Sequence, residues 1–80
     1  MKVPRQVSSD KLIRYLERNW DYKFSRQNGS HIILTTETPA HHSLPVPYRS
    51  AIGPGLFRAI LKQVCDAKGI ELEEILKDFS

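Results

Sequence analysis

Apolar residues recur along the chain with two different periods, and each period predicts a kind of element. The first pattern is helical. Leu12, Ile13, Leu16 and Trp20 fall on one side of a helix, and residues 8–10 carry serine and aspartate side chains of the kind that cap a helix start. The charged residues of this segment lie outside the apolar stripe, so the sequence predicts an amphipathic first helix.

Three segments with the character of β-strands follow. Residues 22–25 alternate apolar and polar side chains, and residues 30–36 are rich in β-branched residues. The Asn28-Gly29 pair between them favours the positive φ angles of a tight hairpin turn. A third strand is expected over residues 43–47, where two prolines without backbone N–H groups favour a short edge strand.

The last part of the chain returns to a helical period. Pro54 suits the first turn of a helix, Gly69 suits its end, and the residues between them repeat apolar side chains at helical spacing. Residues 71–79 form a shorter, acidic segment with the same period. The order α-β-β-β-α with an added C-terminal helix predicts an α+β sandwich, in which the helices cover one face of an antiparallel sheet.

Length and composition favour one folded domain over residues 1–80. A chain of 80 residues holds one compact core, and 40% apolar with 26% charged residues is typical of a globular protein. Cys65 is the lone cysteine and cannot form an internal disulfide, which favours a reducing compartment. The N-terminus shows no apolar stretch for export, and no run approaches the length of a membrane span, so a cytoplasmic protein is expected.

The distribution of charge is uneven. The net charge is +3, but residues 1–65 hold ten Lys and Arg against four Asp and Glu, whereas residues 66–80 hold two against five. A basic body with an acidic tail fits a polyanionic partner for the body. The alternative is a surface whose charges only keep the protein soluble.

Strand alternation predicts on which face of the sheet one histidine of the second strand lies. Ile32 and Leu34 share one face of that strand, and His31, Ile33 and Thr35 share the other. If Ile32 and Leu34 pack under the helices, His31 points to the uncovered face of the sheet. An imidazole on an open face of a basic domain is suited to phosphate chemistry.

Two segments of the chain resemble the HicA family of mRNA interferase toxins. The family's G-S-H motif is matched by RQNGSH at residues 26–31, and its glycine-threonine-leucine-arginine-x-isoleucine-leucine-lysine-glutamine helix is matched by GLFRAILKQ at residues 55–63. The leading SSDKLIRYLERNWDYKFSRQ and the strand ending in PVP agree in order and spacing, so the resemblance spans roughly residues 8–76. Two departures are Leu56 in place of the threonine, and Tyr48-Arg49 where the family often has a histidine.

The resemblance implies a fold, an activity and a partner. It implies a double-stranded-RNA-binding-like fold and a toxin from a prokaryotic type II toxin–antitoxin pair. It also implies that the protein cleaves mRNA, with His31 as the catalytic histidine. The partner that it implies is a HicB-type antitoxin, which binds the toxin and silences it.

Cleavage of RNA by a histidine needs few groups. A general base removes the proton of a 2′-hydroxyl, which then attacks the neighbouring phosphorus, and an imidazole with an ordinary pKa of about 6.5 suits this task. No metal or other cofactor is expected. The expected products are a 2′,3′-cyclic phosphate and a free 5′-hydroxyl, and DNA would not be cleaved. A lysine, a tyrosine or water could protonate the leaving group, and the sequence does not choose among them.

Several polar residues are candidates for contacts to RNA or for placing the histidine. Arg58 and Lys62 are four residues apart and share one helix face, so with other cations they could hold an RNA backbone through salt-dependent contacts. An ordinary solvated surface is the alternative. The RNA-binding candidates are Lys23, Arg26, Ser30, Arg49, Arg58 and Lys62, and the turn residues that would set His31 in place are Asn28 and Gly29.

The sequence also offers other candidate chemistry and other functions. The spacing of the three histidines and Cys65 matches no zinc pattern, so no metal site is expected, but His41 or His42 is a candidate for a second catalytic group. The aromatic residues expected in the core rather than in base stacking are Trp20, Tyr22, Phe24 and Phe57. The competing functions are a non-catalytic RNA-binding module and a protein-interaction domain of the same fold.

Overall fold

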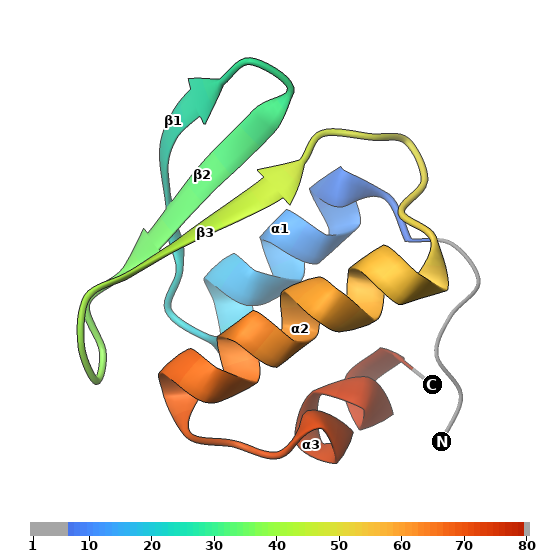
Figure 1. Cartoon of the computed structure of the whole chain (residues 1–80). Helices are drawn as coiled ribbons and strands as arrows, with labels where there is room; N and C mark the ends of the chain where they lie inside the picture. The colour runs from blue at the N-terminus through green and yellow to red at the C-terminus, as the bar shows by residue number, and fades with distance from the viewer. Residues whose placement is uncertain (1–6, 80) are drawn as a thin grey trace.

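Figure 1 shows the computed structural model, in which one sheet lies against a layer of helices. The structure describes residues 7–79. Its elements are α1 (Ser9–Asn19), β1 (Lys23–Asn28), β2 (His31–Thr36), β3 (His42–Pro47), α2 (Pro54–Lys68), α3 (Leu72–Leu76) and a 3₁₀ turn (Lys77–Phe79). The predicted order of elements is therefore confirmed, and so is the α+β class.

The three strands form an antiparallel sheet in the order β1-β2-β3. Because β2 lies in the centre, β3 is an edge strand, as its prolines predict. Helices α1 and α2 lie on one face of this sheet (Figure 1). This face is called the inner face below, and the opposite one the outer face.

The first helix starts with a side-chain cap. The hydroxyl of Ser8 accepts a hydrogen bond from the backbone N–H of Lys11 at 3.1 Å, which satisfies one of the free donors at the helix start. Leu12 and Leu16 are fully buried, while Trp20 is half-buried and packs at the edge of the core. The apolar stripe predicted from the sequence therefore faces the core.

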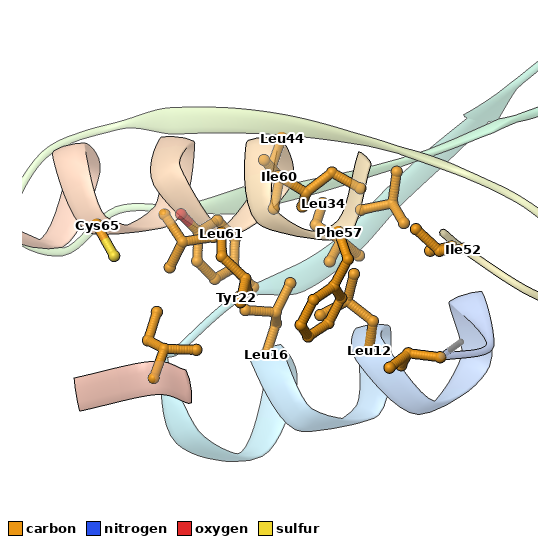
Figure 2. Packing of buried hydrophobic residues seen from close by; sticks show 14 of the residues in the cluster. Leu12, Leu16, Tyr22, Leu34, Leu44, Ile52, Phe57, Ile60, Leu61 and Cys65 are labelled. Carbon is orange, nitrogen blue, oxygen red and sulfur yellow. The ribbon is translucent and has the colours of Figure 1, made fainter. Parts of the chain in front are cut away.

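The core lies between the sheet and the helices (Figure 2). Tyr22 and Phe57 are the largest side chains with almost no exposed surface. Ile75 and Leu76 of α3 are buried in the same cluster, so the C-terminal helix belongs to the core. In addition, Phe79 meets the rings of Tyr15 and Phe57 edge-on, with centroids 4.5 Å and 5.0 Å apart.

The hairpin between β1 and β2 turns one residue later than predicted. Asn28 is not at the centre of the turn, because it is the last residue of β1 and pairs with His31. The two connecting residues are Gly29 and Ser30, and Gly29 alone takes a positive φ, of 62°. A glycine in the first of two turn positions is typical of a type II′ hairpin, which explains why the pair shifts from Asn28-Gly29 to Gly29-Ser30.

The expectation that Phe24 lies in the core is wrong. Its side chain is 57% exposed, and every residue of β1 is exposed. The register between β1 and β2 shifts between Phe24 and Arg26, as a β-bulge does, because Phe24 pairs with Leu34 and Arg26 already pairs with Ile33. Alternation in the sequence predicts which side chains share a face, but it cannot reveal that a strand lies at the uncovered edge of the sheet or contains a bulge.

The ends of α2 follow the predicted signals. Pro54 is its first residue, and Gly69 ends it in the left-handed conformation, with its N–H bonded to the carbonyl of Cys65 at 2.8 Å. No side chain caps the start of α2, because the residue at the cap position is Gly53. Within residues 7–79, none of the helices has the length and apolar character that crossing a membrane requires.

Candidate functional site

The imidazole of His31 lies on the outer face at the first residue of β2. Ile32 and Leu34 belong to the core cluster, and His31 alternates with them and is exposed. Ile33 shares the outer face and is only 9% exposed, although it is not part of the core cluster. The orientation expected from alternation is therefore what the structure shows.

The bulge in β1 brings Arg26 to the same face. Arg26 pairs with Ile33, and Asn28 pairs with His31, so these four residues share the outer face. Without the bulge, Arg26 would alternate to the face of Phe24. Arg26 is therefore a diagonal neighbour of His31, about two residues away along the sheet.

The loop after β3 joins the turn that precedes His31. The backbone N–H of Tyr48 donates to the carbonyl of Ser30 at 2.7 Å, which extends the β2–β3 ladder by one bond. Buried Ser9 fixes the same loop, since its hydroxyl donates to the carbonyl of Pro47 at 2.5 Å and accepts from the N–H of Arg49 at 2.6 Å. Ser30 is thus bonded to Tyr48, and the backbone of the next residue, Arg49, is fixed by Ser9.

Lys23 lies at the other end of the outer face. It pairs with Thr35, four residues along β2 from His31, which corresponds to roughly 13 Å along a strand. A depression beside it is also lined by Asp21 and Glu37, whose carboxylates oppose the binding of an anion there. Lys23 is therefore the weakest of the outer-face candidates for a phosphate contact.

The side chains of Arg58 and Lys62 project into solvent from the helix layer. Both are exposed on α2, whose apolar residues pack under the inner face of the sheet. The structure therefore does not bring them to the outer face with His31, although the sequence grouped all of these cations in one patch. Periodicity places two residues on one side of a helix, but it does not show which side of the sheet that helix covers.

A comparison with known protein families shows to which family the chain belongs. The family described as HicA toxin of bacterial toxin–antitoxin systems matches residues 9–64, more than two thirds of the chain. The chain belongs to the HicA toxin family. The matched segment runs from α1 into α2 and includes His31 and the loop after β3. None of the curated proteins or solved structures compared with it shows a match.

Membership in the HicA family gives the chain a general role. It is a toxin-family protein of a bacterial toxin–antitoxin system, and the partner that such a system implies is an antitoxin. The resemblance of the two sequence motifs to this family is therefore confirmed.

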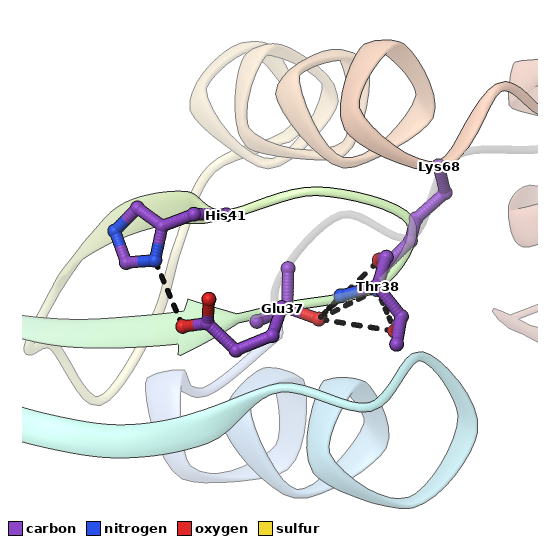
Figure 3. Close-up of polar contacts among 5 residues, drawn as sticks. Glu37, Thr38, His41 and Lys68 are labelled. Atoms are coloured by element: carbon purple, nitrogen blue, oxygen red, sulfur yellow. Dashed lines mark hydrogen bonds and ion pairs between the residues drawn. The ribbon is translucent and has the colours of Figure 1, made fainter.

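Two of the three histidines lie at the far end of the sheet from His31. His42 pairs with Thr36, whereas His31 pairs with Pro47, so five strand positions separate the two imidazoles along β2. His41 is exposed and lies 2.8 Å from a carboxylate oxygen of Glu37 (Figure 3). Neither histidine is therefore placed to share a proton transfer with His31.

His42 faces a partly buried polar cluster formed with Tyr22 and Lys68. Its Nδ1 lies 3.0 Å from the hydroxyl of Tyr22, and the ammonium of Lys68 lies 5.0 Å from the centre of the Tyr22 ring. Burial, followed by the charge of Lys68, lowers the pKa of His42, and burial lowers the pKa of Lys68. Burial also raises the pKa of Tyr22 to about 12. This cluster supports the fold at the end of the sheet opposite to His31.

The expected site residues contain no grouping that could bind a metal ion. Among residues 7–79, no three side chains of His, Cys, Asp or Glu gather at one place. Cys65 is buried in the core, and burial raises the pKa of its thiol, which keeps it protonated. Cys65 therefore has the environment of a structural residue.

Tyr48 is the residue near His31 for which the sequence predicted no role. Its side chain is 53% exposed, and together with Phe24 it forms the pair of large hydrophobic side chains exposed within residues 7–79. The signal available in the sequence was an aromatic residue directly after the Pro-Val-Pro end of an edge strand. That signal does not reveal the hydrogen bond that fixes Tyr48 beside Ser30.

Proposed function

We propose that the chain is a metal-independent endoribonuclease that cleaves mRNA and that His31 is its general base. The observation that carries the proposal is the exposed imidazole at the start of β2, on the uncovered face of the sheet, with Arg26 on the same face. Membership in the HicA toxin family supports a growth-inhibiting activity, and cleavage of mRNA is what the motif resemblance implies. The proposed partner is a HicB-type antitoxin that binds the toxin and silences it.

The proposed reaction is an attack of RNA on its own backbone. His31 removes the proton of a 2′-hydroxyl, the 2′-oxygen bonds to phosphorus, and the bond from phosphorus to the 5′-oxygen breaks. The 5′-oxygen takes up a proton, so the products are a 2′,3′-cyclic phosphate and a 5′-hydroxyl. Arg26 and Arg49 are the cations that would hold the phosphoryl oxygens, because guanidinium groups form strong hydrogen bonds to phosphate.

The proposed RNA path follows the outer face of the sheet. It runs from Arg26 past His31 to the loop after β3, where Arg49 follows Tyr48, the residue whose N–H is bonded to the carbonyl of Ser30. Lys23 would contribute at the end of this path. Arg58 and Lys62 lie outside this path, because they project from the helix layer.

Replacement of His31 tests the proposal. Purified wild-type protein is expected to nick single-stranded RNA in the presence of a metal chelator, and His31→Ala should slow nicking by about 10²–10⁴-fold, the range for a lost general base. His41→Ala is the matched control and should cleave like the wild type, because His41 is exposed at the far end of the sheet.

The same assay separates the proposal from its alternatives. RNA in which the attacking 2′-hydroxyl is removed should bind but stay intact. Equal nicking by the His31→Ala variant would refute the catalytic role of this histidine. Salt-dependent RNA binding by the wild type without any cleavage would indicate an RNA-binding module, and the absence of RNA binding would favour a protein-interaction domain.

A further inference from the structure

A depression of about 360 Å³ opens beside Arg49, at the end of the proposed RNA path. Its lining residues are Ser8, Asp10, Tyr48, Arg49 and Ser50. Two segments that are distant in sequence form it, namely the start of α1 and the loop after β3. The hydrogen bonds of Ser9 to Pro47 and Arg49 join these segments, with an additional bond of 3.0 Å from the N–H of Ser9 to the carbonyl of Arg49. The walls of the depression are therefore held in place before any ligand binds.

The aromatic wall of the depression is an exposed tyrosine that pairs with Ser30 at the end of the β2–β3 ladder and therefore alternates to the face opposite His31. Tyr48 is 53% exposed, and its backbone is fixed to Ser30, the residue that precedes His31. The core does not use this ring, because Tyr48 is not among the residues that pack in or against the core cluster. Exposed aromatic side chains on a fixed backbone are the platforms on which proteins stack unpaired bases.

The polar walls carry opposite charges that are not joined to each other. Within residues 7–79, the carboxylate of Asp10 and the guanidinium of Arg49 make no ion pair. Both groups are therefore available to a ligand that presents N–H donors to the first and oxygen acceptors to the second. A nucleotide is such a ligand, because its base carries donors and its phosphate carries acceptors.

The acceptor wall distinguishes guanine from uracil. The two oxygens of a carboxylate accept hydrogen bonds and donate none when the group is ionised. Guanine presents two adjacent N–H donors on its Watson–Crick edge, so it matches the two oxygens of Asp10. Uracil presents one N–H between two carbonyl oxygens, which the carboxylate repels.

We propose that this depression binds an unpaired guanine of the RNA substrate, where the RNA passes around the end of β3 from the phosphate that the 2′-oxygen attacks. The base stacks on the ring of Tyr48, its Watson–Crick edge donates to Asp10, and Arg49 holds the adjoining phosphate. The inference rests on the proposed endoribonuclease function, because it adds a specificity subsite to that centre. It assigns Tyr48 and Asp10 a role in the choice of the cleavage site.

Binding is tested first, in full-length protein carrying His31→Ala so that the RNA stays intact. The probes are fluorescently labelled eight-nucleotide RNAs that contain either one guanine or uracil at the same central position. Tyr48→Ala should weaken binding of the guanine RNA by roughly 5- to 150-fold, the range for one lost stacking contact, whereas Tyr48→Phe should stay within twofold. Phe24→Ala is the control, because Phe24 is the other exposed aromatic side chain, and it should leave binding unchanged.

Specificity is tested next, with variants that keep His31. Mapping of cleavage ends should show guanine at one fixed position relative to the cut in the wild type, and Asp10→Asn should lose this preference while cleavage continues. Unchanged binding in Tyr48→Ala, or the same cleavage pattern in Asp10→Asn, would overturn the inference. A Tyr48→Phe variant that binds RNA normally but fails to cleave it would also overturn the inference. The hydroxyl of Tyr48 would then be needed for cleavage, and the stacking of its ring would not explain the role of this residue.

The two experiments keep this inference separate from the proposed function. If the wild type cleaves RNA without any base preference around the cut, the endoribonuclease proposal stands and the guanine subsite fails. If the wild type does not cleave RNA at all, the endoribonuclease proposal fails, and the guanine subsite, which rests on it, fails as well.

Discussion

Gly29 holds the backbone of the β1–β2 turn at a φ of 62°, and this dihedral angle determines where β2 begins. An L-residue with a side chain is strained in this region, whereas glycine is not. Because Gly29 and Ser30 form the whole connection, the strand restarts at His31, directly beside Asn28. A single residue therefore controls the position of the proposed catalytic histidine.

The first prediction concerns this glycine. Gly29→Ala should lower the free energy of unfolding by about 1–2 kcal/mol, the cost of a left-handed residue with a Cβ atom. The loss would be conformational, because a Cβ at this position meets no atom within 4 Å. Urea denaturation followed by circular dichroism measures it.

Gly55→Ala is the matched control for the turn glycine. Gly55 also has open space around an added Cβ, but it lies in the first turn of α2 without a positive φ. Alanine there should leave the stability unchanged or raise it by up to about 1 kcal/mol, because it favours the helix. Equal destabilisation by both substitutions would show that the turn conformation is not the cause.

At the scale of elements, the last turn of α2 is tied to the β2–β3 connection. The ammonium of Lys68 donates to the hydroxyl of Thr36 at 2.8 Å and to the carbonyl of Thr38 at 2.5 Å. Figure 3 shows Lys68 reaching from the helix to this loop. The hydroxyl of Thr38 in turn donates to Asp21 at 2.8 Å, so the loop is also bonded to the segment between α1 and β1. One lysine therefore couples a helix end to the end of the sheet.

The second prediction removes this ammonium and keeps the aliphatic stem. Lys68→Met should lower the free energy of unfolding by about 1–3 kcal/mol, the range for hydrogen bonds to a charged group. It should also raise the pKa of His42, because the Lys68 charge contributes to lowering that pKa, although burial will still hold it below its ordinary value. NMR titration of the histidine ring protons measures the pKa, and chemical denaturation measures the stability.

Lys62→Met is the control for this prediction. Lys62 is exposed on the same helix, so the change in stability should stay within about 0.5 kcal/mol and the pKa of His42 should not move. If both lysine variants leave the His42 titration unchanged, the proposed coupling between the helix end and the sheet is wrong.

At the scale of the whole molecule, the sheet has one face covered by helices and one open face. Helices α1, α2 and α3 bury their apolar side chains on one side of the molecule, and this leaves the outer face of the sheet to the solvent. The cations that the sequence grouped together are distributed over both sides. Arg26 lies on the outer face and Arg49 lies in the loop beside it. Arg58 and Lys62, in contrast, project from α2.

The third prediction compares two double variants with the same change of charge. Arg26→Gln with Arg49→Gln should weaken RNA binding and reduce the slope of log K against log salt by about 1.4, since each single-strand phosphate contact contributes about 0.7. Arg58→Gln with Lys62→Gln should leave this slope nearly unchanged. Fluorescence anisotropy at several salt concentrations measures both, and a larger effect from the helix pair would place the RNA on the other side of the molecule.

The sequence by itself determined the order of the elements, the edge position of β3, the ends of α2 and the faces of β2. These features depend on local signals, such as periodicity, proline and glycine, which act within a few residues. Its two motifs also pointed to the HicA family. Only the tertiary structure decided that Phe24 is exposed, that the bulge turns Arg26 toward His31, and that Arg58 and Lys62 leave from the opposite layer. It also placed Tyr48 beside Ser30 and joined α1 to the β3 loop through Ser9. These facts depend on which elements cover one another and on contacts between residues up to 40 positions apart, and no local pattern records them.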